Sequence, residues 1–297
     1  MRKAWSSRSI GSRWQHGFFY SLIRLGGRRA AYAMLVFVVL YYVLFRPSAR
    51  NRSRPYLERR FPGRNAVSRL WDSYRISLEA GKVLVDRAVL GILGPGRFDV
   101  DHTGREELLG LAREGHGLIL VTAHAGCWQV AMANLDNLRA PINLLIHREE
   151  GDVDLHYFEH GGAAAPYRII DPAAPLGGTL EMLHVLNHGE VLCIMGDRAM
   201  GSDRGTVAVD FLGGAVQLPF TPYKLASATG APVAVIFLHK SGPDSYALQV
   251  AKVIRVPENL GRTPEAYRPY ANQFVLALED FVAAHPYQYF NFFDMWQ

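Results

Sequence analysis

From residue 117 onward the chain alternates between short apolar runs and amphipathic stretches, and this alternation constrains the fold most strongly. Five apolar runs are bounded by turn residues: Gly117–Thr122, Ile142–His147, Tyr167–Ile170, Val191–Met195 and Val233–Leu238. Helical patterns occupy several of the intervals: Cys127–Leu138, Leu176–Asn187 and Tyr223–Thr229. Alternating strands and helices are typical of a parallel sheet with helices on its faces. We therefore expect an α/β fold with a mostly parallel central sheet flanked by helices.

The segment after the last of these runs predicts an antiparallel strand pair and a closing helix. Tyr246–Val256 alternates between apolar and polar residues and is expected to pair with Ala234–Leu238 across a turn at residues 241–244. Pro264–Ala284 has the pattern of a helix, and the aromatic tail Tyr287–Trp296 is expected to pack back onto it. The chain of 297 residues, 49% of them apolar, is long enough to form one large domain plus an appendage.

The region before the sheet predicts helices and a linker. Apolar residues recur near helical spacing over 67–90, which indicates one or two amphipathic helices. A short helix is expected over Arg105–Arg113. Residues 46–60 are strongly basic and contain two prolines, so this segment is predicted to be a linker.

The charge of the chain is concentrated at its N-terminus. The first 60 residues carry 13 Lys and Arg against one acid, Glu58, whereas the rest hold 19 basic and 26 acidic groups. A nucleic-acid enzyme more often carries its basic surface on the folded body, so this distribution argues against nucleic acid as a partner. Two cysteines, Cys127 and Cys193, exclude a disulfide scaffold and a Cys-rich zinc module. No spacing of Cys and His predicts a metal site.

Residues 30–45 form an uninterrupted apolar run that we interpret as part of a membrane anchor. As a helix it would be about 24 Å long, against about 30 Å of bilayer hydrocarbon. A cleaved signal peptide fits poorly because Arg46-Pro47 follows the run. Basic residues are almost equally numerous on both sides, which favours a helix or bent helix pair lying in one leaflet. A tilted span and a buried core helix remain as alternatives, and anionic phospholipid is the natural partner of the arginines.

A histidine follows the first buried strand, at the point where ligands bind in α/β sheets. The segment reads His124-Ala-Gly-Cys-Trp-Gln129 and leads into a predicted helix. Gly126 permits a tight turn, and the helix start offers backbone N–H groups to the same crevice. An imidazole in this position can act as a general base near neutral pH. A structural histidine is the alternative that this segment alone leaves open.

Asp197 and Arg198 follow another buried strand and are expected on the same edge as His124. A planar guanidinium suits a phosphate or a carboxylate through paired hydrogen bonds. An Asp–Arg pair that only fixes a loop is the structural alternative. Arg148 and Arg204 lie in predicted loops on this edge and are further candidates for binding a phosphate of a substrate, although a solvated surface group explains each of them as well.

The residue pattern resembles the lipid A biosynthesis acyltransferases of the lysophospholipid acyltransferase superfamily. Residues 124–129 are similar to the His-x-Gly-Asn-Trp-Glu form of that family's acyltransferase block. Later and earlier parts of the chain also fit: Asp197-Arg198, Gly205, Phe211-Leu212-Gly213, Pro219, Leu225-Ala226, Gly230-Ala231-Pro232-Val233, Phe290–Trp296, Trp14, Gly26–Arg29 and Tyr56-Leu57. The resemblance covers nearly the whole chain. It implies a sheet like that of glycerol-phosphate acyltransferases, with residues 1–50 as anchor, 51–297 as acyltransferase domain, and 51–100 of that domain as a helical lead-in.

The resemblance implies transfer of a fatty acyl group from an acyl thioester to a hydroxyl or amine of a lipid or glycolipid. The donor would be acyl carrier protein or coenzyme A, with no other cofactor and no metal. His124 would be the general base, Gln129 its partner, and Gly126, Asp197, Arg198, Arg204 and Arg148 would bind substrate. The implied location is the cytoplasmic face of a bacterial inner membrane.

One departure from the family pattern affects catalysis. Gln129 stands where the family has Asp or Glu, and a neutral amide supplies no charge to an imidazolium. Either Gln129 suffices, or another acid such as Asp197 or Asp203 substitutes, or the protein is catalytically weak. Cys127 offers a rival as a covalent nucleophile. A membrane-bound thioesterase and a non-catalytic lipid-binding protein are the competing functions.

Overall fold

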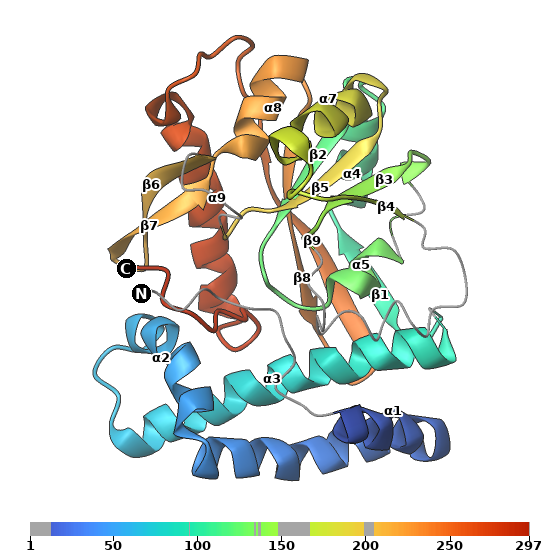
Figure 1. Ribbon diagram of the computed structural model, residues 1–297, viewed down its shortest axis with the longest axis vertical. Helices are drawn as coiled ribbons and strands as arrows, with labels where there is room; N and C mark the ends of the chain where they lie inside the picture. The colour runs from blue at the N-terminus through green and yellow to red at the C-terminus, as the bar shows by residue number, and fades with distance from the viewer. Residues whose placement is uncertain are drawn as a thin grey trace. The chain divides into compact units, whose positions relative to one another are not determined.

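The computed structural model describes residues 13–94, 96–133, 135, 138–147, 167–198 and 205–296, which form two compact units (Figure 1). One unit holds three N-terminal helices and the segment Tyr287–Asp294, and the other holds the central sheet with its helices. The helices of the first unit are α1 (Arg13–Phe45), α2 (Pro47–Arg60) and α3 (Ala66–Leu93).

Helix α1 is bent, which is one of the two forms that the sequence left open. Its path breaks at Gly27, where φ is 68° and ψ is −173°, a conformation outside the helical region that glycine adopts without a side-chain clash. The break separates the N-terminal part of α1 from the apolar run at 30–45. Within the described residues, α1 is the one helix long and apolar enough to cross a membrane by length and composition, over Gly17–Phe45.

The prediction of a linker over 46–60 is wrong, because α2 fills this segment. Pro47 occupies the start of the helix, where a missing N–H costs nothing. Pro55 lies inside the helix, yet Tyr56 and Leu57 are buried and fix it by packing. The Tyr56 ring meets Tyr289 of the aromatic tail edge-on, with centroids 5.3 Å apart. Tertiary burial therefore outweighs the local effect of proline.

Helix α3 is a single helix that covers the predicted range. The side chain of Asn65 accepts a hydrogen bond from the backbone of Ser68 at 2.9 Å, and this N-cap sets the start. Asp72 is buried and accepts hydrogen bonds from Arg64 at 3.2 Å and from the Tyr287 hydroxyl at 2.7 Å. The carboxylate thus binds the tail to α3.

The sheet of the second unit has seven strands in the order β1-β9-β8-β2-β5-β3-β4. Its strands are β1 (Asp99–Thr103), β2 (Leu118–Thr122), β3 (Ile142–Leu145), β4 (Tyr167–Ile170), β5 (Val191–Met195), β8 (Val233–Lys240) and β9 (Ser245–Ile254). The pairs from β8 to β4 are parallel, and β8 pairs with β9 in an antiparallel hairpin. The predicted fold class is confirmed, although β1 was not foreseen.

Helices pack on this sheet as the alternating pattern indicated. They are α4 (Arg105–Ala112), α5 (Trp128–Met132), α7 (Thr179–Asn187) with a preceding 3₁₀ turn η2 (Pro175–Gly178), α8 (Thr221–Thr229) and α9 (Pro264–Ala284). Helix α9 contributes Phe274 and Phe281 to a cluster around Phe237 of β8. One expectation is corrected: the helix predicted over Cys127–Leu138 ends at Met132.

A second hairpin lies between β5 and α8, in a segment for which the sequence predicted no strand. Strands β6 (Thr206–Phe211) and β7 (Gly214–Pro219) pair in an antiparallel ladder across a two-residue turn. Both turn residues, Leu212 and Gly213, have positive φ, which is typical of tight hairpins. Trp296 stacks on Phe211 and donates a hydrogen bond to its carbonyl at 2.9 Å. The end of the aromatic tail therefore meets this hairpin, a partner that the sequence did not indicate.

Candidate active site

Two neighbouring parallel strands bring His124 and Asp197 together. Strands β2 and β5 pair in register, with Thr122 opposite Met195. His124 lies two residues beyond Thr122, and Asp197 lies two residues beyond Met195. The N–H of Gly196 donates to the Thr122 carbonyl at 2.7 Å, which continues the ladder between the two segments. Both side chains therefore reach the carboxyl edge of the sheet, where ligands bind in open α/β folds.

The imidazole of His124 is held by the carboxylate of Asp197. Nδ1 of His124 lies 2.9 Å from Oδ1 and 3.1 Å from Oδ2, and the backbone N–H of His124 donates to Oδ2 at 3.2 Å. The Asp197 side chain is fully buried, whereas that of His124 is 29% exposed. Because a carboxylate only accepts, Nδ1 of the neutral ring carries the proton and Nε2 carries the lone pair.

The environment of Asp197 favours its charged form. Burial alone would raise the pKa of this carboxyl group, but the positive charge and hydrogen bonds of His124 and the charge of Arg198 outweigh it. The pKa of Asp197 is therefore held below its ordinary value. An anion in this position stabilises the imidazolium that forms when His124 takes a proton.

Glycines let the two loops after these strands pass close to the sheet. Gly126 has a φ of 60°, and a Cβ there would lie 2.1 Å from the carbonyl oxygen of Leu238. A Cβ at Gly196 would lie 2.6 Å from a methyl group of Val121. The family resemblance implies a substrate-binding role for Gly126, and the structure explains the residue by the close approach of its backbone to β8.

Gln129 lies at the start of α5 and is completely buried. The thiol of Cys127 donates to its Oε1 at 3.5 Å, and Cys127 is also 0% exposed. Such a buried thiol is suited to packing, whereas a nucleophilic cysteine needs access to its substrate. The family has an acid at the position of Gln129, and the sequence left open whether another acid takes over its role. Asp197 is one of those candidates, and its carboxylate contacts His124.

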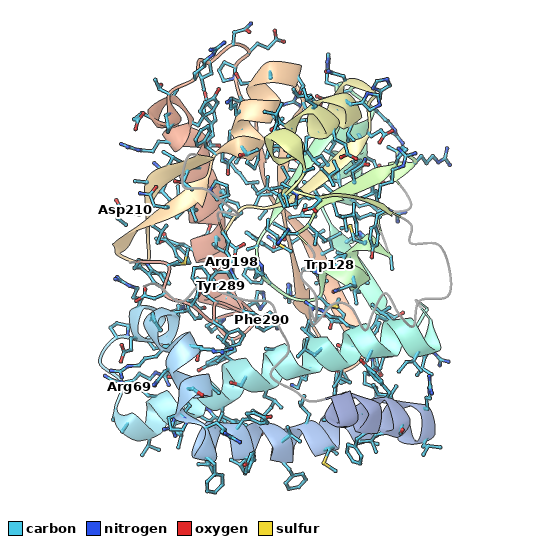
Figure 2. The ribbon with its side chains drawn as sticks, viewed as in Figure 1. Arg69, Trp128, Arg198, Asp210, Tyr289 and Phe290 are labelled. Atoms are coloured by element: carbon cyan, nitrogen blue, oxygen red, sulfur yellow. The ribbon has the colours of Figure 1, made fainter. Side chains whose placement is uncertain are left out.

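Arg198 and Trp128 come from the segments that follow β5 and β2 (Figure 2). Arg198 is half-buried next to Asp197, and Trp128 meets Tyr167 edge-on with centroids 5.8 Å apart. The other predicted arginines, Arg148 and Arg204, lie outside the described residues, as does Asp203. Within the ranges that the structure covers, no three His, Cys, Asp or Glu side chains gather to hold a metal ion.

A histidine pair at the end of β8 is absent from the sequence-based predictions. His239 stacks on His285 with ring centroids 3.8 Å apart. Burial and the neighbouring His285 lower the pKa of His239 to about 4, and burial lowers the pKa of His285. Gly126 of the His124 loop approaches the backbone of Leu238 and His239, so this pair adjoins the candidate site. The sequence signal was available, since His239 directly follows the apolar run Val233–Leu238.

Comparison with protein families defines the class to which this fold and site belong. The model of the bacterial lipid A biosynthesis acyltransferase family matches residues 9–297. The chain therefore belongs to this family, and its enzyme class is that of the acyltransferases. This match confirms the resemblance inferred from the residue pattern.

A particular relative is the phosphatidylinositol mannoside acyltransferase of Mycolicibacterium smegmatis (strain ATCC 700084 / mc(2)155). It is 25% identical to this chain over 199 residues, which make up 62% of the chain and 63% of the relative. The chain thus matches less than two thirds of that protein's length.

Proposed function

We propose that this protein transfers a fatty acyl group from an acyl thioester to a hydroxyl of a membrane lipid or glycolipid, with His124 as general base. The observation that carries the proposal is the contact of His124 Nδ1 with the buried Asp197 carboxylate at 2.9 Å. A hydroxyl is a poor nucleophile until a base removes its proton, and the contact directs the basic Nε2 of His124 away from Asp197. Asp197 touches no reacting atom in this scheme and acts as a positioning residue.

The proposed reaction needs no covalent acyl-enzyme. Nε2 of His124 takes the hydroxyl proton while the acceptor oxygen bonds to the thioester carbonyl carbon, and the carbonyl oxygen becomes an oxyanion. The start of α5 offers little stabilisation to an anion because this helix is only five residues long. Arg198 is therefore the candidate that stabilises the oxyanion. The carbonyl then re-forms, the C–S bond breaks, and the thiolate takes the proton from the His124 imidazolium.

The substrates follow from the family and from the relative. The family is named for lipid A biosynthesis and the relative for a phosphatidylinositol mannoside, so a glycolipid acceptor is the proposed substrate class. The donor is proposed to be acyl carrier protein or coenzyme A carrying the acyl chain. Because the acceptor is a membrane lipid, α1 is proposed to hold the enzyme on the cytoplasmic face of the inner membrane.

The buried Gln129 and Cys127 are assigned supporting roles. Gln129 occupies a fully buried position. A carboxylate there would need a partner of opposite charge, whereas the amide is neutral and needs no such charge. We propose that Gln129 supports the loop of His124 and that Asp197 supplies the charge. Arg148 and Arg204 stay candidates for binding phosphate on the donor or acceptor.

The test is acyl transfer from a radiolabelled acyl thioester into membrane lipid. Wild type is expected to label a lipid with at least one of the two carriers, and His124→Ala is expected to abolish the labelling. The matched control is His188→Ala, because His188 is exposed and precedes the amino end of β5. If the label appears only in free fatty acid, the protein is a thioesterase and the proposal is wrong. Wild-type labelling that survives in His124→Ala would refute the assignment of the base. The absence of turnover with both carriers would favour a non-catalytic lipid-binding protein.

A further inference from the structure

The apolar run of α1 presents two opposite faces, and one of them is covered. Ala31, Leu35, Val39 and Val43 recur at every fourth position and are at most 7% exposed. At 100° per residue these four form one stripe along the helix. The opposite side is exposed by 39 to 69% and consists of Val36, Phe37, Leu40, Tyr41, Leu44 and Phe45.

Helix α3 covers the buried stripe along the length of α1 (Figure 1). A Cβ at Gly81 of α3 would lie 2.8 Å from a methyl group of Leu35, so the Leu35 side chain packs directly on the backbone of α3. The Tyr32 hydroxyl donates to Asp86 of α3 at 2.5 Å. Burial and the Asp86 charge strongly raise the pKa of Tyr32, so its hydroxyl stays protonated. Helix α1 is therefore bound to α3 by packing and by a hydrogen bond.

Helix α3 has a composition that excludes it from the hydrocarbon of a bilayer. A charged side chain is costly at the bilayer centre, and the cost adds up when several of them lie on one helix. The charged residues of α3 extend from its first turn to position 87 and number seven: Arg69, Asp72, Arg75, Glu79, Lys82, Asp86 and Arg87. If α1 crossed the membrane in this arrangement, it would bring these charges with it. The packed pair of helices is thus incompatible with a span.

Exposed arginines lie at both ends of the apolar run. Arg24 and Arg29 precede it, and Arg46 and Arg52 follow it, all four exposed. Each basic residue near an anionic membrane surface adds to the attraction of the protein to that surface. Equal attraction at both ends favours a helix parallel to the surface over one that places its two ends on opposite sides. The charges also favour an anionic lipid as the partner of the exposed face, because a second copy of this basic unit would be repelled by it.

We propose that α1 is a monotopic lipid-binding helix that lies along the surface of an anionic membrane, packed on α3. The exposed face of residues 36–45 enters the acyl region of one leaflet, and both ends of α1 stay at the level of the headgroups on the same side. This inference rests on the membrane location proposed above. It is independent of the chemistry of His124, so His124→Ala should bind vesicles as well as wild type.

The first test maps lipid contacts on the full chain bound to anionic vesicles that contain a phospholipid with a photoreactive acyl chain. We expect crosslinks at Phe37, Tyr41 and Leu44 and none at Leu35 or Val39. Crosslinks around the whole helix would show that α1 has left α3 and would overturn the proposal. In a second measurement, Ser21→Cys and Ser48→Cys should both react with a membrane-impermeant maleimide added outside the vesicles. Reaction at only one end would demonstrate a span.

A pair of matched variants separates lipid binding from self-association. Phe37 is 69% exposed on α1, and Leu276 is 61% exposed on α9. Phe37→Glu should weaken binding to anionic vesicles at least tenfold, because burying a large apolar side chain contributes about 1.5–3 kcal/mol. Leu276→Glu should leave binding within about twofold of wild type, the small effect usual for an isolated surface substitution. If Phe37→Glu instead dissociates a dimer in solution and leaves vesicle binding unchanged, the face is an interface between copies and the proposal fails.

Discussion

The charge of Asp197 offers the sharpest test of the candidate site. Asparagine has nearly the same shape as aspartate, so Asp197→Asn keeps the packing of this buried position. The wild-type carboxylate accepts from Nδ1 of His124 and from the backbone N–H of His124. An asparagine has one acceptor oxygen for these two donors. If the oxygen serves the backbone, the amide nitrogen faces Nδ1, and the ring proton moves to Nε2, where it blocks the base.

The expected loss follows from this geometry. A hydrogen bond to a charged group contributes about 1.5–3 kcal/mol, which alone corresponds to a rate loss of about 10–150-fold. A wrong tautomer adds to this, and the serine-protease triad gives about 10⁴-fold for the same substitution. We therefore expect Asp197→Asn to lower the acyl transfer rate by about 10²–10⁴-fold.

The assay is kcat and KM for acyl transfer, with the thermal midpoint measured alongside. We expect kcat to fall while KM stays within a few-fold, since the Asp197 side chain is fully buried and is not proposed to touch substrate. Asp197→Glu should recover part of kcat, because it restores the charge. A variant Asp197→Asn that folds normally and keeps more than one third of wild-type kcat would refute the argument.

Three further predictions concern neighbouring residues. Gln129→Glu should lower the thermal midpoint without raising kcat, because the new carboxylate is fully buried; a faster enzyme would show that the amide limits catalysis. Gly126→Ala should have a free energy of unfolding in urea about 2 kcal/mol or more below that of Gly213→Ala, because the Cβ added at position 126 meets backbone atoms and the Cβ added at position 213 does not. Equal losses of stability in the two variants would contradict the close contact at Gly126. His239→Gln should reduce the loss of stability between pH 6.5 and about 4, since His239 takes up a proton in the unfolded state before the folded state does. Urea titrations over this range check the last effect, and an unchanged pH dependence would contradict it.

Much of the sheet could be predicted because its strands are continuous apolar runs. The bounds of β4 and β5 agree with the predicted ones, and α9 covers the predicted Pro264–Ala284. Buried parallel strands and a long amphipathic helix are local patterns, which a single sequence displays directly. The sequence also placed His124 and Asp197 on one edge of the sheet.

The remainder depended on contacts between distant residues. Nothing local shows that β5 is adjacent to β2, because some 70 residues separate them, so the sequence allowed a direct contact of Asp197 with His124 without specifying it. Helix α2 was missed because its two prolines hide a helix that Tyr56 and Leu57 stabilise by burial. The β6–β7 hairpin was missed although Thr206–Phe211 does alternate, because the strand is short and glycines lie on both sides of it.

The register between β2 and β5 has a consequence for how this site can change during evolution. Thr122 and Met195 lie opposite each other in the sheet, and His124 and Asp197 each follow two residues later. The contact between the imidazole and the carboxylate depends on these two spacings being equal. An insertion of one residue before Asp197 would turn its side chain to the opposite face of the segment. The chemistry of the edge can therefore be altered residue by residue through substitution, whereas changes of length must be confined to the loops farther from the strand ends.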